Sequence, residues 1–159
     1  MTRLYGRAPS GQRLIDKTPH GHWMTTTLIA ALGIDGVLCS MVVDGSVNGD
    51  VFLAFLERVL TPQLKPGDIV IMDNLSSHKM QRVAELIEQT GAQVRYLPPY
   101  SPDLNPIENV ISKIKQRLRS LACRTKEALW TSMQSVLDCI TSTDAANCYA
   151  HAGYTLHTN

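Results

Sequence analysis

The sequence predicts an α/β fold in which a mixed β-sheet is flanked by helices. Residues 24–32 and 37–43 are rich in apolar and β-branched side chains and are separated by Gly33-Ile34-Asp35-Gly36, which predicts a β-hairpin. Residues 68–97 follow a strand, helix, strand pattern, which predicts a βαβ unit with parallel strands and a right-handed crossover. With 159 residues, 44% of them hydrophobic, the chain can form one domain with its own core.

Capping residues and periodicity predict the remaining elements. Asn48 caps a helix that ends at Pro62, and Ile69–Met72 is an apolar strand of the kind buried in parallel sheets. A helix over 77–90 and a strand over 93–97 follow. The next helix is long and amphipathic, with an apolar stripe of Ile107, Ile111, Ile114, Leu118 and Leu121. The other expectations are helices over 125–140 and 143–151, a mostly irregular segment 1–22 with one short strand near 13–16, and a frayed tail 154–159.

Charge and hydropathy exclude several classes of protein. Fifteen Lys and Arg against 14 Asp and Glu leave a net charge of +1, so a DNA or membrane partner would have to meet a local patch. No apolar run reaches the roughly 18 residues that span a bilayer, and the first residues lack the apolar core of a signal peptide. We therefore expect a cytoplasmic protein with no membrane partner. The four cysteines have no metal-ligand spacing and are expected to be buried thiols.

Asp73 is the first candidate for a functional residue. It follows an apolar strand that is expected to be parallel to its neighbour, and open α/β sheets place their ligands at the carboxyl ends of such strands. The alternative is structural, because Asp73-Asn74 is also a good sequence for the turn into a helix.

Glu108 is the second candidate, and it also has a structural alternative. Asn105 as N-cap, Pro106 at the first helical position and Glu108 at the third form a variant capping box. The helix dipole favours an ionised glutamate at this position, and an ionised carboxylate is also what a hard divalent cation requires. Capping and metal binding therefore both remain open.

One combination of motifs is more specific than either carboxylate alone. Asp73-Asn74 is followed by His78, the 34 residues 74–107 separate Asp73 from Glu108, and Glu108 ends the string Leu97-Pro98-Pro99-Tyr100-Ser101-Pro102-Asp103-Leu104-Asn105-Pro106-Ile107-Glu108. With these motifs the chain resembles, over nearly its whole length, the catalytic domain of the DDE transposases of the mariner-type superfamily, in its bacterial insertion-sequence branch. This family is related by fold to retroviral integrases and ribonuclease H.

The resemblance implies a fold, a site and a reaction. The fold would be a ribonuclease-H-like mixed sheet flanked by helices. Asp73 and Glu108 would be the second and third of three carboxylates that bind two Mg²⁺ or Mn²⁺ ions, with Asn74 and His78 beside them. The reaction would be DNA strand cleavage at transposon ends followed by strand transfer. The partners would be transposon-end and target DNA, in a full-length enzyme that is a homodimer associated with the nucleoid.

A basic stretch follows Glu108 and is a candidate DNA contact. Residues 113–126 contain six basic side chains and no acidic one. They are expected either to form a solvated helix face or to contact phosphates, which adds affinity without sequence information. The DNA-contact candidates are Lys79, Lys113, Lys115, Arg117 and Arg119. Tyr100 is open to two roles, stacking on a base or buried packing, of which buried packing is our expectation.

The sequence departs from the family pattern in one respect. The family's first aspartate ends the first strand, which lies in the middle of the sheet between the hairpin and the strand that ends at Asp73. No acidic residue before Asp73 ends an apolar strand, and Asp16 is a poor substitute. We therefore expect a truncated catalytic domain that lacks the first central strand and one metal ligand, and that is inactive alone. The alternative is an orphan remnant that binds DNA or interferes with a full-length transposase.

Overall fold

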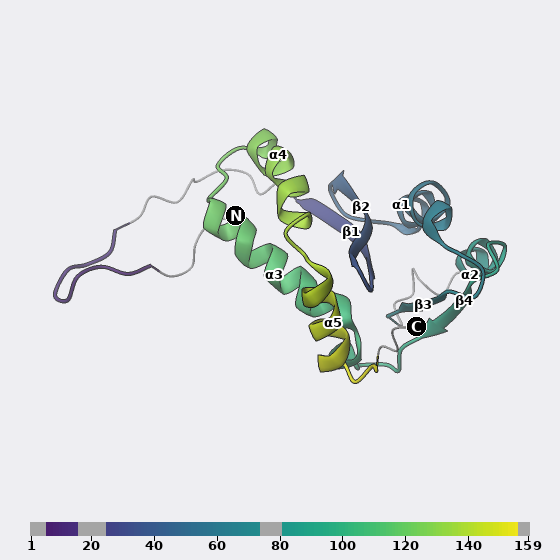
Figure 1. Ribbon diagram of the computed structural model, residues 1–159. Helices are drawn as coiled ribbons and strands as arrows, with labels where there is room; N and C mark the ends of the chain where they lie inside the picture. The colour runs from purple at the N-terminus through teal and green to yellow at the C-terminus, as the bar shows by residue number, and fades with distance from the viewer. Residues whose placement is uncertain (1–5, 16–24, 74–80, 156–159) are drawn as a thin grey trace.

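The computed structural model describes residues 6–15, 25–73 and 81–155. Within these residues, a β-hairpin lies between two helical groups, α1 and α2 on one side and α3, α4 and α5 on the other (Figure 1). A second, parallel pair of strands lies next to α2. The predicted α/β class with strands flanked by helices is therefore confirmed.

The hairpin forms as the sequence predicts. Strands β1 (Thr26–Gly33) and β2 (Gly36–Asp44) pair antiparallel, with Gly33 opposite Gly36 at the turn and a register shift after Ala31. Gly36 has φ +130°, and a Cβ at this position would lie 2.7 Å from the carbonyl oxygen of Ile140. Only glycine therefore allows the turn to lie against the backbone of Ile140.

The βαβ unit is also confirmed where the structure describes it. Strands β3 (Ile69–Met72) and β4 (Gln93–Tyr96) are parallel, and α2 (Gln81–Glu88) lies between them in the chain. The start of the predicted helix, residues 77–80, lies outside the described residues. The preceding helix, α1 (Gly49–Phe55), begins at Asn48, whose side-chain oxygen accepts a hydrogen bond from the Val51 N–H. It continues through a π turn, η1 (Leu56–Leu60), and a 3₁₀ turn, η2 (Thr61–Gln63).

The strands form two separate sheets rather than one. In the described part of the chain, β1 pairs with β2 and β3 with β4, and no strand joins β1 to β3. The expectation that Ile69–Met72 is wholly buried is wrong, since Ile69 is 59% exposed and Val70 and Ile71 are half-buried. A strand with a partner on one edge only is not covered as the middle strand of a sheet would be.

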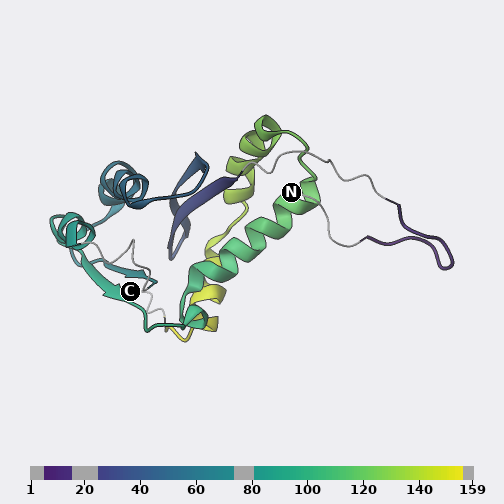
Figure 2. The same ribbon diagram turned by 180° about the vertical axis from the view of Figure 1, so that it is seen from behind.

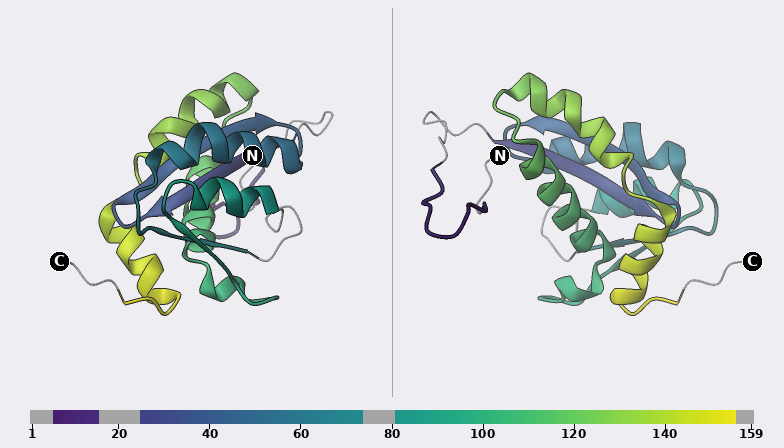
Figure 3. Two further views of the ribbon diagram at one scale, coloured as in Figure 1. Left: turned by 90° about the vertical axis from the view of Figure 1, so that its right-hand side faces the viewer. Right: turned by 60° about the vertical axis from the view of Figure 1, so that its left-hand side comes forward.

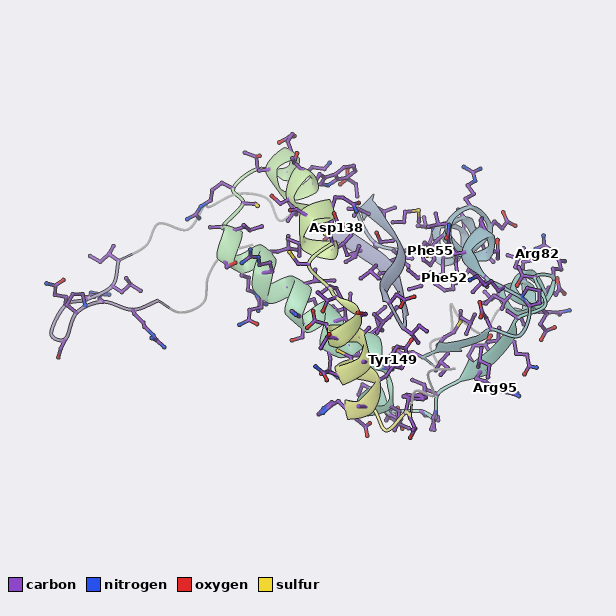
Figure 4. All side chains as sticks on the ribbon, viewed as in Figure 1. Phe52, Phe55, Arg82, Arg95, Asp138 and Tyr149 are labelled. Atoms are coloured by element: carbon purple, nitrogen blue, oxygen red, sulfur yellow. The ribbon has the colours of Figure 1, made fainter. Side chains whose placement is uncertain are left out.

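Two cores cover the two faces of the hairpin. The first is centred on Phe52, Phe55 and Leu56 of the α1–η1 segment, and Figure 4 shows both phenylalanines on the side of α1 that faces the hairpin. Ile29 and Met41 of the hairpin pack against this core, as do Met72, Val83 and Ile87 of the βαβ unit. The second core consists of residues from the C-terminal helices, packed against Leu28, Leu32, Val37 and Val42 of the hairpin.

Helix α3 (Pro106–Leu121) crosses the hairpin, with α4 (Lys126–Leu137) and α5 (Ser142–His151) alongside it (Figures 2 and 3). The predicted apolar stripe of α3 is displaced. Its buried residues are Pro106, Val110, Ile114 and Leu118, whereas Leu121 is 43% exposed and Ile107 and Ile111 are half-buried. The contact with the hairpin and its neighbouring helices therefore follows the row of residues four apart, rather than the alternation of four and three.

Several smaller expectations are corrected. Residues 6–15 contain a turn at Ser10 and Gly11 but no strand, so no strand forms at 13–15. Tyr154 is anchored rather than frayed, because its hydroxyl donates to the Leu104 carbonyl at 3.0 Å. The cysteines are free but not buried: Cys139 is exposed and the other three are intermediate. Across the described residues, no helix is both long and apolar enough to cross a bilayer.

An ion pair between α3 and α5 gives the fold a testable pH dependence. Lys113 Nζ lies 2.5 Å from Asp144 Oδ1, and Asp144 also forms a capping box with Thr141 at the start of α5. The Lys113 hydrogen bond, followed by those from Thr141, lowers the pKa of Asp144 from 3.8 to about 2.

Because the folded state holds this pKa below its unfolded value, the stabilisation is present above about pH 4 and is lost as the pH falls toward 2. In circular-dichroism melts, we expect the Tm of Asp144→Asn to fall less than that of the wild type between pH 4 and pH 2. Asp35→Asn, in the exposed hairpin turn, is the control. Equal losses in the wild type and Asp144→Asn would contradict the prediction.

Candidate functional site

Asp73 lies at the carboxyl end of β3, as the sequence predicts. The residue before it, Met72, accepts a backbone hydrogen bond from the Leu97 N–H at 2.9 Å, so the end of β4 lies beside the end of β3. The Asp73 side chain is half-buried. The segment that follows β4 and leads to α3 therefore leaves the sheet at the edge where Asp73 lies.

Asn105 connects this edge to α3. Its side chain is 8% exposed and is the one buried polar side chain among the residues described. Its Nδ2 donates to Asp73 Oδ1 at 2.6 Å. Although Asn105 occupies the N-cap position of α3, its side chain makes no capping hydrogen bond. The predicted capping box is therefore wrong, because the side chain that would cap the helix binds the carboxylate of another element.

Glu108 lies in the first turn of α3 and is exposed. Its backbone N–H donates to the Asn105 carbonyl oxygen at 3.1 Å. No hydrogen bond or ion pair joins its carboxylate to any other described residue, so the side chain does not take part in capping. Asn105 thus holds Asp73 through its side chain and Glu108 through its backbone. The carboxylate of Glu108 remains available at the positive end of the helix dipole.

The donor set suits a hard divalent cation, which takes oxygen ligands from few protein groups and keeps positions for water and phosphate. Asp73 and Glu108 supply two carboxylates, and Asn105 contacts the first through its side chain and the backbone of the second through its carbonyl. Within the described residues, no group of three or more His, Cys, Asp or Glu side chains is placed to hold a metal ion. The other predicted neighbours, Asn74, His78 and Lys79, lie outside the described residues, as does Asp16.

The predicted basic residues of α3 are exposed but do not share one environment. At about 100° per residue, Lys115 and Arg119 lie on the flank of the helix that carries Glu108. Lys113 lies on the opposite flank, where it pairs with Asp144 of α5. Arg117 lies between Lys113 and the buried row. The structure therefore separates one basic flank, next to Glu108, from a lysine that is already paired.

Two features of the loop between β4 and α3 are not predicted by the sequence: the exposure of Tyr100 and the contact with Tyr154. Tyr100 is fully exposed, at 102% of its reference area, so the expected buried packing is wrong. The hydroxyl of Tyr154 holds the 3₁₀ turn η4 (Pro102–Leu104) through the Leu104 carbonyl. The residue type at position 105 is consistent with its contact to Asp73. The amide of an asparagine can donate a hydrogen bond to a carboxylate, whereas an ionised aspartate at the same N-cap position could not.

Comparison with known proteins identifies the family. Residues 1–130 match the family described as DDE superfamily endonuclease. The chain belongs to this family. Because the match covers most of the chain, the resemblance carried by Asp73, Glu108 and the proline-rich string is confirmed at the level of the DDE superfamily. No curated protein matches the chain.

Solved structures of Mos1 transposase agree with the fold. The Mos1 strand transfer complex is similar with a TM-score of 0.70 and 17% identity, covering 99% of this chain and 51% of that one. The Mos1 transposase catalytic domain with raltegravir and Mn is similar with a TM-score of 0.60 and 18% identity, covering 83% and 78%. The ribonuclease-H-like class expected from the sequence is thereby confirmed. The chain spans about half the length of the Mos1 chain in the strand transfer complex.

The hydrogen bond from Asn105 to Asp73 can be tested without any metal. A hydrogen bond to a charged group contributes about 1.5–3 kcal/mol, and Asn105→Ala should lower the free energy of unfolding in urea by about this amount. Asn105→Ser is too short to reach Asp73 but can cap α3 itself, so it should be destabilising by about 1 kcal/mol less. Thr125→Ala removes a true N-cap of α4 and serves as the control, with a loss of about 1 kcal/mol.

The assignment also requires that Asn105 act through Asp73. In an Asp73→Ala background, Asn105→Ser should therefore have a much smaller effect. A fully additive double mutant, or a neutral Asn105→Ser, would show that the amide stabilises the chain by another route.

Proposed function

We propose that this chain carries the catalytic site of a bacterial insertion-sequence transposase, which cleaves DNA at transposon ends and transfers the strand to a target. The observation that carries the proposal is the Asn105 bridge, which joins Asp73 and Glu108 in a chain of the DDE superfamily endonuclease family. The similarity to a Mos1 strand transfer complex and to a Mos1 paired-end complex with transposon-end DNA supports DNA as the partner. It also supports a homodimeric full-length enzyme. A transposase of this kind would work in the cytoplasm, on the nucleoid.

Asp73 and Glu108 would hold Mg²⁺ or Mn²⁺, with two ions in a complete site. Structures of the Mos1 catalytic domain with Mn and with Mg support this choice of metals. When bound, such a pair of ions activates an attacking water or hydroxyl group and stabilises the leaving oxygen at phosphorus. In this chain, Asn105 would fix the rotamer of Asp73, and the first turn of α3 would keep Glu108 ionised. Asn74 and His78 remain proposed neighbours of the site.

We further propose that this chain is a fragment that lacks the first catalytic aspartate and is inactive alone. Two observations support this. The described residues contain no group of three or more His, Cys, Asp or Glu side chains placed to hold a metal ion, and β1 and β3 belong to separate sheets. The same observations favour a second candidate function, a remnant that binds DNA or interferes with a full-length transposase.

Metal binding tests the site directly. In calorimetric titrations with Mn²⁺, Asp73→Ala and Glu108→Ala should each weaken binding by at least about tenfold, because each removes a ligand. Glu127→Ala is the matched control, since Glu127 is also an exposed glutamate in the first turn of a helix. In a Mg²⁺-dependent nicking assay the chain alone should be inactive. Nicking that survives both alanine substitutions, or Mn²⁺ binding that neither changes, would contradict the site assignment.

Salt dependence tests the DNA-contact residues. We propose that Lys115 and Arg119, on the flank of Glu108, contact phosphates more closely than Lys113, whose charge is paired with Asp144. In fluorescence-anisotropy titrations with duplex DNA, Lys115→Ala should reduce the slope of log K against log salt concentration by about 1. Lys113→Ala should change it less. An unchanged slope for Lys115→Ala, or equal changes for both variants, would exclude this arrangement. Arg117, and Lys79 outside the described residues, remain weaker candidates.

A further inference from the structure

Tyr100 combines two unfavourable features that the fold does not compensate. It has φ +60°, in the left-handed region, where a bulky side chain is strained. Its side chain is also fully exposed, at 102%, so it gains nothing from burial. The other non-glycine residue with positive φ in the described chain is the small Ala122, at the C-cap of α3.

The local sequence explains why the strain persists. Pro99 and Tyr100 form the turn that follows β4, and turns with positive φ at the second central position strongly prefer glycine or asparagine there. A glycine at position 100 would therefore serve the turn better than tyrosine. Strained residues of this kind cluster at functional sites, where the side chain itself is needed.

The loop presents the ring on a stiff support. Pro98 and Pro99 precede Tyr100, and Pro102 begins the 3₁₀ turn η4. Ser101 Oγ donates to the Pro99 carbonyl at 3.4 Å, and the Tyr154 hydroxyl holds the far end of η4. The backbone that carries the ring therefore loses little further conformational freedom when the ring binds a ligand.

Both ends of the loop that carries Tyr100 lie beside Asp73. Leu97 is hydrogen-bonded to Met72, the neighbour of Asp73, and three residues of chain reach at most about 11 Å. On the other side of the loop, Asn105 binds Asp73 directly. Tyr100 is therefore within the span of a few nucleotides of any phosphate held at Asp73 and Glu108.

We propose that Tyr100 stacks on a nucleobase of the DNA strand held at this site. The inference rests on the proposed function, to which it adds a contact with the base rather than the phosphate. An exposed aromatic ring, in a loop that leads from the end of β4, beside the end of β3, to a helix carrying Glu108 and a basic flank, has the features of a stacking platform for single-stranded or unpaired DNA. Such stacking accepts any base, because every base has a π-face. Tyr100 would thus add affinity near the reacting phosphate without selecting a sequence.

The test compares a twelve-nucleotide oligothymidylate with an abasic oligonucleotide of the same length and charge, by fluorescence anisotropy. The wild-type chain should bind the base-bearing strand about 5- to 100-fold more tightly. Tyr100→Phe should keep this preference, and Tyr100→Ala should lose it while binding the abasic strand as the wild type does. Tyr100→Gly should also lose the preference although its Tm is no lower than that of the wild type, because glycine suits the turn.

Trp130→Ala is the control, since Trp130 is another exposed aromatic, on α4 and paired with Lys126, and its loss should leave the preference unchanged. A preference for bases that survives in Tyr100→Ala would overturn the proposal, as would a wild-type chain that binds both strands equally. Equal, salt-dependent binding would leave the proposed DNA contact intact and remove only the stacking. Absence of binding to both strands would contradict the proposed function as well.

Discussion

The packing of the α1–η1 segment is the interaction on which the rest of the fold depends. No backbone ladder joins β1 to β3 in the described chain, so side chains must hold the two sheets together. Phe52, Phe55 and Leu56 do this, because residues of both the hairpin and the βαβ unit pack against the core that they form. Full burial of a large apolar side chain contributes about 1.5–3 kcal/mol, and the contacts of this one segment are shared between both sheets.

The candidate site lies where the two parts of the fold meet. Asp73 belongs to the βαβ unit, whereas Glu108 belongs to a helix packed on the hairpin and on α5. Asn105 is the residue that spans this boundary, with its side chain on Asp73 and its carbonyl on the Glu108 N–H. The interpretation of this arrangement as a metal site depends on the family match, since two carboxylates and a bridging amide alone would be equally compatible with the start of a helix.

Local chemistry made much of the fold predictable, and long-range contacts account for the errors. The hairpin turn, the Asn48 cap and the parallel βαβ unit follow from short sequence patterns. The partner of Asn105 could not be predicted, because Asp73 is 32 residues away and competes with the local cap. The exposure of Tyr100 likewise depends on what packs over the loop. For the candidate site, the sequence and the family pattern predict Asp73 and Glu108 as ligands, but not the contact of Asn105 with Asp73.

The separation of the two sheets has a mechanical consequence. A hydrogen-bonded ladder fixes the register of neighbouring strands, whereas apolar packing is non-directional and sets no register. The βαβ unit is joined to the hairpin mainly by such packing, so the junction is compliant in comparison with the interior of a continuous sheet. Asp73 lies on one side of this junction and the helix that carries Glu108 on the other, and the Asn105 side chain, 2.6 Å from Asp73, bridges the two. The relative placement of the two carboxylates therefore depends on how the apolar side chains pack at the junction.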